Sequence, residues 1–204
     1  MRDDKTQRVG ILAFGSLIHD PGPEIGCLVI KRIKVRTPFA VEFARYSRGT
    51  RAGAPTLSPV IRGGAPVDAM ILMFRHGTIF EQAADMLWRR ETGNIGTGKT
   101  YPAARTPRAV RVRMLRNFAG VSEVLYTDFY QRGKIRRPNP KMLARRAIAS
   151  VKDSERGRDG ISYLIGVIQV GVLTPLTNDY RNEILRLTQS GSLSSALKAL
   201  KRDV

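Results

Sequence analysis

Apolar positions in the first third of the chain form short runs that are typical of strands. Residues 9–18 are almost all apolar, run into a Gly-Ser turn, and are followed by a Pro-Gly stop at Pro21-Gly22. Three more strands are predicted from continuous or alternating apolar positions, at residues 26–36, 39–46 and 66–74. The Gly- and Pro-rich stretch 49–59 is expected to be a loop with one short extended piece.

The apolar period changes at residue 78. Over residues 78–91 the apolar positions share one helical face, Thr78 with Glu81 matches a capping box, and Gly93 is expected to end the helix. Two strands are predicted next, at 110–117 and 121–130, and after them the pattern is helical over residues 138–151, 161–172, 179–189 and 194–201.

This order of elements predicts an α+β fold with a mixed sheet, because strands fill the first two thirds of the chain and helices the last third. A chain of 204 residues, with no repeat, low-complexity tract or evident linker, is expected to form one domain over residues 1–204. Residues 1–8 are expected to be flexible.

The single cysteine, Cys27, excludes an intrachain disulfide and favours a reducing compartment. Its apolar neighbours Leu28 to Ile30 favour a buried structural thiol over a catalytic one. The start of the chain carries acidic residues and no apolar stretch, unlike a signal peptide, and no apolar run is long enough to span a bilayer. We therefore expect a soluble cytoplasmic protein that does not bind membranes.

A formal net charge of +18, from 35 Lys and Arg against 17 Asp and Glu, distinguishes this chain from most cytoplasmic proteins. The basic residues form three clusters, at 31–36, 108–116 and 132–146, the last without any acid. Aromatic residues do not interleave these clusters as a base-stacking surface would require. Weak, nonspecific polyanion binding at a solvated basic face is therefore favoured over a dedicated nucleic-acid site.

Metal and nucleotide chemistry receive little support from the sequence. The two histidines, His19 and His76, have no Cys or His neighbours at ligand spacing, and Ser16 lacks the Gly-x-Ser-x-Gly setting of a hydrolase nucleophile. Gly93 to Thr100 has the spacing of a phosphate-binding loop. It follows a predicted helix rather than a strand, however, and Pro102 prevents a long helix after it, so we expect no bound nucleotide and no metal.

Four segments, in this order along the chain, resemble motifs of the ChaC-like γ-glutamylcyclotransferases. They are Phe14-Gly15-Ser16-Leu17-Ile18 with Pro21-Gly22; Ser47-Arg48-Gly49-Thr50 with Pro55-Thr56-Leu57-Ser58-Pro59-Val60; Leu87-Trp88-Arg89-Arg90-Glu91-Thr92-Gly93 with Tyr101; and Ala144 to Ala149 with Gly157 to Leu164. The resemblance covers roughly residues 9 to 190. It implies a barrel-like mixed sheet with flanking helices and a helical C-terminal end.

The resemblance also implies a reaction and a set of site residues. The reaction is the cyclisation of a γ-glutamyl amine or peptide, glutathione being one example, to 5-oxoproline without metal, ATP or cofactor. Glu91 would be the general acid and base. The substrate would be bound by Phe14, Gly15, Ser16, Leu17, Arg48 and Tyr101, with Arg48 pairing with a substrate carboxylate and the backbone of Gly15 to Leu17 facing the oxyanion.

Three positions depart from the family pattern: Phe14 replaces a tyrosine, Ala13 replaces a glycine, and the segment from Glu91 to Tyr101 is longer. Read without the resemblance, Glu91 is a solvated helix-end carboxylate paired with a neighbouring arginine. The alternative function is therefore a basic polyanion- or RNA-binding protein on the same fold, without catalysis.

Overall fold

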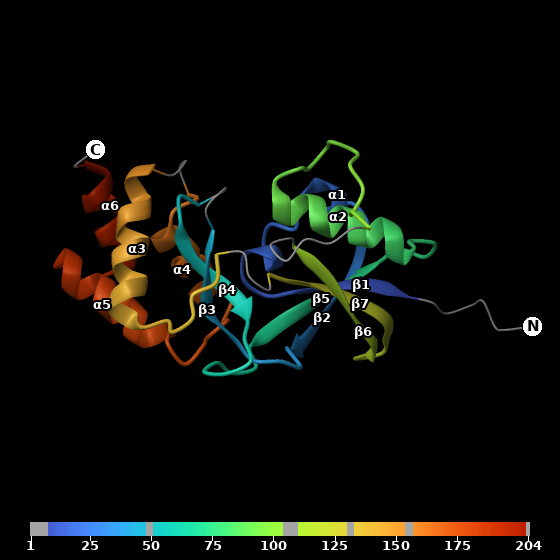
Figure 1. Ribbon diagram of the computed structural model, residues 1–204, viewed down its shortest axis with the longest axis horizontal. Helices are drawn as coiled ribbons and strands as arrows, with labels where there is room; N and C mark the ends of the chain where they lie inside the picture. The colour runs from blue at the N-terminus through green and yellow to red at the C-terminus, as the bar shows by residue number, and fades with distance from the viewer. Residues whose placement is uncertain (1–7, 48–50, 104–109, 130–132, 154–156, 203–204) are drawn as a thin grey trace, which may run out of the picture. The chain divides into compact units, whose positions relative to one another are not determined.

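A computed structural model describes residues 8–47, 51–103, 110–129, 133–153 and 157–202 of the chain (Figure 1). Contacts within it define two compact units, one made of Met1–Thr37 and Asp68–Gln131, the other of Pro38–Val67 and Arg132–Val204. The expectation that residues 1–204 form one domain stays a prediction. Of residues 1–8, which were expected to be flexible, residues 1–7 lie outside the described part of the chain. Arg8 is held by two hydrogen bonds, since its amide donates to Ser122 Oγ at 3.2 Å and its carbonyl accepts from the amide of Glu123 at 3.1 Å.

The first unit contains a five-stranded mixed sheet in the order β2-β5-β1-β7-β6 (Figure 1). The strands are β1 (Val9–Ala13), β2 (Val29–Arg36), β5 (Asp68–Phe74), β6 (Arg111–Phe118) and β7 (Val121–Asp128). Strand β1 is buried along its whole length at the centre, antiparallel to β5 and parallel to β7. Strands β2 and β6 are the two edges, and both carry exposed basic side chains.

Helix α2 (Phe80–Thr92) packs on β1, β6 and β7 of this sheet, and the short α1 (Pro23–Gly26) packs on α2. The apolar face predicted for α2 is largely the buried one, since Ala83, Met86 and Leu87 are all buried, whereas Ile79 is exposed. Gly93 ends the helix in the left-handed conformation (φ 73°), as predicted, because only glycine adopts it without strain. The prediction of a capping box is wrong, because Ile79 is the N-cap residue and its side chain makes no capping hydrogen bond.

Two strand predictions in the first unit are too long by three residues or more. Strand β1 ends at Ala13, and residues Gly15–Ile18 form a 3-10 helix, because Gly15 has a φ of 76° that no strand continues through. Strand β2 begins at Val29 rather than at residue 26, since Pro23 starts a helical turn before it. Cys27 is exposed, not buried, because it lies at the end of that turn.

The second unit combines a two-stranded antiparallel sheet with four helices (Figure 1). The strands are β3 (Val41–Ser47) and β4 (Ala54–Pro59), and the helices are α3 (Pro140–Asp153), α4 (Gly160–Gln169), α5 (Thr177–Thr188) and α6 (Leu193–Arg202). Helix α3 contacts β4 and all three other helices, so it forms the centre of the unit. All four predicted C-terminal helices are present, with ends shifted by a few residues.

A close approach of α4 to α3 explains one glycine of the fourth resembling segment. A Cβ atom at Gly160 would lie 2.8 Å from Cα of Ala147 and 3.1 Å from Cβ of Ala54, so no larger residue fits there. In the same region the amide of Leu57 donates to the hydroxyl of Tyr163 over 3.1 Å. The second and fourth resembling segments therefore touch, although they lie far apart in sequence.

The described elements confirm an α+β fold with a mixed sheet. Neither sheet closes on itself among the described strands, so the barrel-like form stays a prediction. In the part of the chain that the structure describes, no helix has both the length and the apolar character needed to cross a membrane.

Candidate functional site

The turn after β1 is compact and held by its own backbone. Phe14 is extended and half-buried, and Gly15 then turns the chain into the 3-10 helix. The amides of His19 and Asp20 both donate to the carbonyl of Ser16, at 3.3 and 2.9 Å. Leu17 is buried, so its side chain holds the turn against the body of the first unit while Ser16 keeps part of its surface.

Glu91 lies in the last turn of α2, one residue before the helix ends. Its side chain is 12 % exposed, and Oε1 accepts a hydrogen bond of 3.0 Å from Nη1 of Arg90. The other oxygen, Oε2, has no hydrogen-bond partner among the described residues. A carboxylate with one oxygen fixed and one oxygen open is able to accept a proton from a ligand without first breaking a contact.

Arg90 connects Glu91 to the turn after β1. Its Nη2 atom donates to Ser16 Oγ at 3.3 Å and to the carbonyl of Asp20 at 2.8 Å. Ser16 and Glu91, both predicted as site residues, are therefore bound to the same guanidinium group. Arg90 itself was not among the predicted site residues. Its position next to Glu91 was the only available signal, and such neighbouring pairs are usually solvated.

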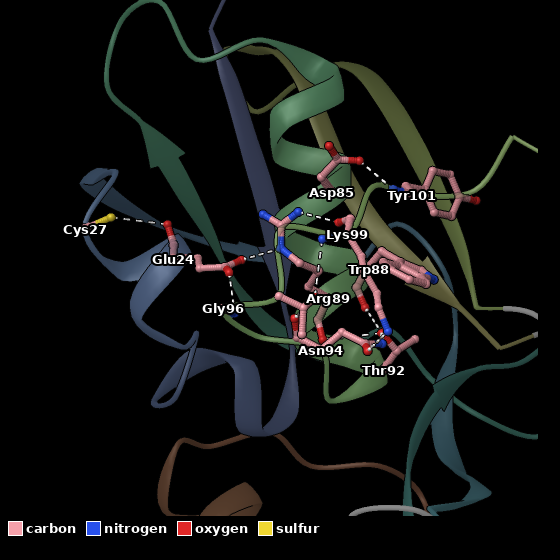
Figure 2. A network of polar contacts seen from close by, with 11 residues as sticks. Glu24, Cys27, Asp85, Trp88, Arg89, Thr92, Asn94, Gly96, Lys99 and Tyr101 are labelled. Carbon is pink, nitrogen blue, oxygen red and sulfur yellow. Dashed lines mark hydrogen bonds and ion pairs between the residues drawn. The ribbon is translucent and has the colours of Figure 1, made fainter.

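Tyr101 is anchored at two points in the first unit. Its amide donates to Asp85 Oδ1 at 2.6 Å, and its hydroxyl accepts from the amide of Val112 at 3.1 Å. Figure 2 shows the first of these contacts on the middle of α2. Asp85 precedes Glu91 by about 9 Å along the helix axis, at 1.5 Å per residue. Arg48, the remaining predicted binding residue, lies outside the described residues.

The segment after α2 is tied to α1 by a network around Arg89 (Figure 2). Arg89 Nε donates to Glu24 Oε2 at 2.8 Å, and Arg89 Nη1 donates to the carbonyl of Lys99 at 2.6 Å. Glu24 Oε1 accepts from the amide of Gly96 at 2.7 Å. Partial burial raises the pKa of Glu24, but the hydrogen bonds from Gly96 and Arg89 outweigh it and leave the pKa below its usual value.

This network bears on the phosphate-loop spacing of Gly93 to Thr100. The amide of Gly96 is already occupied by a carboxylate, and residues 99–103 have no regular secondary structure. A phosphate loop needs free amides at the start of a helix. The described residues of this segment therefore form a connecting loop and not the start of a helix.

Two surface cavities are formed by residues other than the predicted site residues. One, of about 560 Å³, is lined by His76, Gly77, Thr78, Ile79, Phe80, Glu81, Met114 and Glu123 and lies at the start of α2. The other, of about 530 Å³, is lined by Asn139, Pro140, Lys141, Asp179, Asn182, Glu183 and Arg186 in the second unit. Within the described ranges no three His, Cys, Asp or Glu side chains are grouped to hold a metal ion.

Comparison of the chain with protein-family models gives no match, and comparison with curated proteins gives none either. The resemblance therefore depends on the four short segments and their order alone.

Proposed function

We propose that this protein is a γ-glutamylcyclotransferase with the fold of that family. It would convert a γ-glutamyl amine or peptide to 5-oxoproline and the free amine or peptide. The observation that carries the proposal is the shared contact of Ser16 and Glu91 with Arg90. It supports the proposal because the family's reaction needs a carboxylate next to the Gly-Ser turn.

The reaction is an intramolecular aminolysis. The α-amino nitrogen of the γ-glutamyl group attacks its own γ-carbonyl carbon, a new C–N bond closes the five-membered ring, and the original γ-amide C–N bond breaks. Attacker and target belong to one molecule, so the enzyme needs to hold the reactive conformer rather than to activate the carbonyl with ATP.

Glu91 would perform the proton transfers. Oε2 would take one proton from the α-ammonium group and pass it to the nitrogen of the leaving amine as the γ-amide bond breaks. The ring nitrogen would lose a second proton as the lactam forms, and this proton would end on the released amine as its ammonium form, so that no net proton is consumed. Backbone amides of Gly15 to Leu17 would donate to the γ-carbonyl oxygen as it becomes negative. Phe14, Tyr101 and Arg48 remain proposed substrate contacts, and the role proposed for Arg48 is to pair with a carboxylate of the substrate.

The test is a screen of γ-glutamyl compounds scored for 5-oxoproline. It should include glutathione, γ-glutamyl amino acids and γ-glutamyl amines, each incubated with the wild-type protein in the presence of a chelator. We expect release of 5-oxoproline and the free amine in equal amounts from at least one compound. If no compound in any of the three classes gives product, the proposal is wrong.

A second candidate function is the binding of polyanions at a basic surface. Exposed basic side chains lie on residues 134–152 of the second unit, and this stretch of sequence contains no acid. Glu183 of α5 lies near two of them, Lys141 and Arg145. The members are Lys134, Arg136, Arg137, Lys141, Arg145, Arg146 and Lys152. We call this set the α3 basic surface, and we expect it to bind polyanions weakly and without sequence preference.

A further inference from the structure

We propose that Arg90 is a positioning residue that sets the separation between the Glu91 carboxylate and the turn after β1. The inference rests on the proposed function, since positioning matters only if Glu91 takes part in a reaction at that turn. It goes beyond that function because it assigns a role to a side chain that touches neither substrate nor reacting atoms.

Three contacts of the guanidinium carry the inference. Nη1 holds Glu91 Oε1 at 3.0 Å, and Nη2 holds Ser16 Oγ at 3.3 Å and the Asp20 carbonyl at 2.8 Å. A guanidinium is planar and rigid, so these acceptors are kept at fixed positions relative to one another. Arg90 thus holds the end of α2 and the turn after β1 in a fixed position relative to each other.

The stem of Arg90 lies near the end of the turn. A Cβ atom at Gly22 would lie 3.6 Å from Arg90 Cγ, so a larger residue at this position would meet the stem. The side chain of Arg90 is only 16 % exposed, so most of it is packed against the protein and little of it contacts solvent. One side chain therefore holds the connection between β1 and α1 at two points, Ser16 and Asp20.

Arg89 provides a matched control. It lies in the same helical turn, has a similar exposure of 12 %, and pairs with Glu24 at 2.8 Å. Its other contact is the carbonyl of Lys99, so it holds the loop after α2 and does not hold Glu91 or Ser16. Loss of either arginine should cost similar stability, but only the loss of Arg90 should disturb the geometry around Glu91.

The first measurement is amide hydrogen exchange, which needs no substrate. In Arg90→Met the amides of His19 and Asp20, which close the turn, should exchange at least severalfold faster than in the wild type. In Arg89→Met the change should appear instead at Gly96, whose amide is held by Glu24. Equal exchange at His19 and Asp20 in the wild type and Arg90→Met would overturn the inference.

The second measurement is the kinetics of 5-oxoproline release. Arg90→Met should lower kcat by about 10–100-fold with KM changed little, because displacement of a catalytic group by an ångström has effects of this size. Arg90→Lys keeps the positive charge but lacks the forked guanidinium group, so its kcat should lie between those of the wild type and Arg90→Met. If Arg90→Met does not fold, Arg90→Lys takes its place in the comparison. Arg89→Met should keep the wild-type kcat.

A double-mutant cycle separates positioning from general damage. If Arg90 acts through the Glu91 carboxylate, Arg90→Met should lower kcat much less in a Glu91→Gln background than in the wild type. Additive effects would overturn the inference while leaving the proposed function in place. A wild-type protein that releases no 5-oxoproline would overturn both, and this outcome is recognised before any variant is made.

Discussion

Two carboxylates in this protein, Glu91 in the first unit and Glu42 in the second, have opposite surroundings. Glu42 is fully buried in β3 and its oxygens accept from Thr174 Oγ1 at 2.5 Å, the Phe43 amide at 2.8 Å and the Leu176 amide at 3.3 Å. Glu91 is slightly exposed, has a single arginine partner, and has one oxygen without a partner among the described residues.

The difference distinguishes a structural carboxylate from one that is able to react. Every donor around Glu42 is uncharged and belongs to the fold, and two of them lie just before α5, so the side chain joins β3 to the start of that helix. Burial raises the pKa of Glu42, and the hydrogen bonds from Thr174, Phe43 and Leu176 oppose that rise only in part. A perturbed pKa alone would select Glu42 as the candidate catalytic acid, whereas the open oxygen selects Glu91.

The largest effect is expected at Glu91. Glu91→Gln keeps the size of the side chain and a hydrogen-bonding oxygen but cannot carry the proton, so kcat should fall by about 10²–10⁴-fold. The melting temperature should change little, because the group makes one partly exposed ion pair. Steady-state 5-oxoproline release together with thermal unfolding would check both. Full activity in this variant would remove Glu91 from the mechanism.

The reverse outcome is expected at Glu42. Glu42→Ala leaves the Thr174 hydroxyl and two backbone amides in a buried region without their acceptor, which should lower the free energy of unfolding by roughly 2–4 kcal/mol. The folded fraction should turn over substrate at the wild-type rate. Urea unfolding and active-site-normalised kinetics would measure this. A stable Glu42→Ala variant with lost activity would reverse the roles of the two carboxylates.

Gly15 should show a smaller effect that has two components. An alanine there should cost about 1–2 kcal/mol for its φ of 76°, and Gly77→Ala (φ 84°, with open space around its Cβ) is the matched control for that strain alone. If substrate meets the backbone at Gly15, Gly15→Ala should lose binding and turnover in addition to stability. Equal kinetics in the two alanine variants would make Gly15 a simple turn residue.

The pH dependence of stability offers a further test at Glu42. Because its pKa is raised in the folded state, the folded protein holds the proton more tightly than the unfolded chain. The contribution of Glu42 to stability should therefore fall as the pH rises from below the ordinary value of 4.5 through the raised folded pKa. Comparing urea unfolding of the wild type and Glu42→Gln across this range isolates the effect from that of Glu24, which has the opposite sign.

The smallest effect concerns the α3 basic surface. Neutralising Arg136, Arg137 and Lys141 together should weaken retention on heparin and leave γ-glutamyl turnover unchanged. Neutralising Lys31, Lys34 and Arg116 of the first unit makes the same change in net charge and should weaken retention less. Binding of any kind should decrease steeply with added salt. Tight, sequence-selective RNA binding that persists in moderate salt would favour the alternative function.

Periodicity predicted most of the elements, because burial on one face imposes a period of two or 3.6. It failed where the apolar run continued through a change of conformation: Leu17 and Ile18 are buried like strand residues but belong to a 3-10 helix. It also failed at Cys27, whose apolar neighbour Ile30 is 63 % exposed.

The candidate site was predictable only in part. Glu91 and Ser16 came from the resemblance, but the contact that joins them passes through Arg90, and hydrogen bonds between distant segments leave no local pattern. The same holds for Glu42, whose partner Thr174 is 132 positions away. In a strand of alternating apolar and polar residues, a glutamate such as Glu42 is predicted to face solvent. Only the tertiary structure shows that its side chain is buried.

The basic side chains on β2 and β6 have a consequence for the behaviour of this protein at high concentration. Both strands end the sheet, and a free edge offers backbone donors and acceptors to a strand of another molecule. Lys31, Lys34 and Arg36 on β2, and Arg116 on β6, would bring like charges together if two such edges paired. Part of the +18 charge would then act against self-association and aggregation, with no nucleic acid involved.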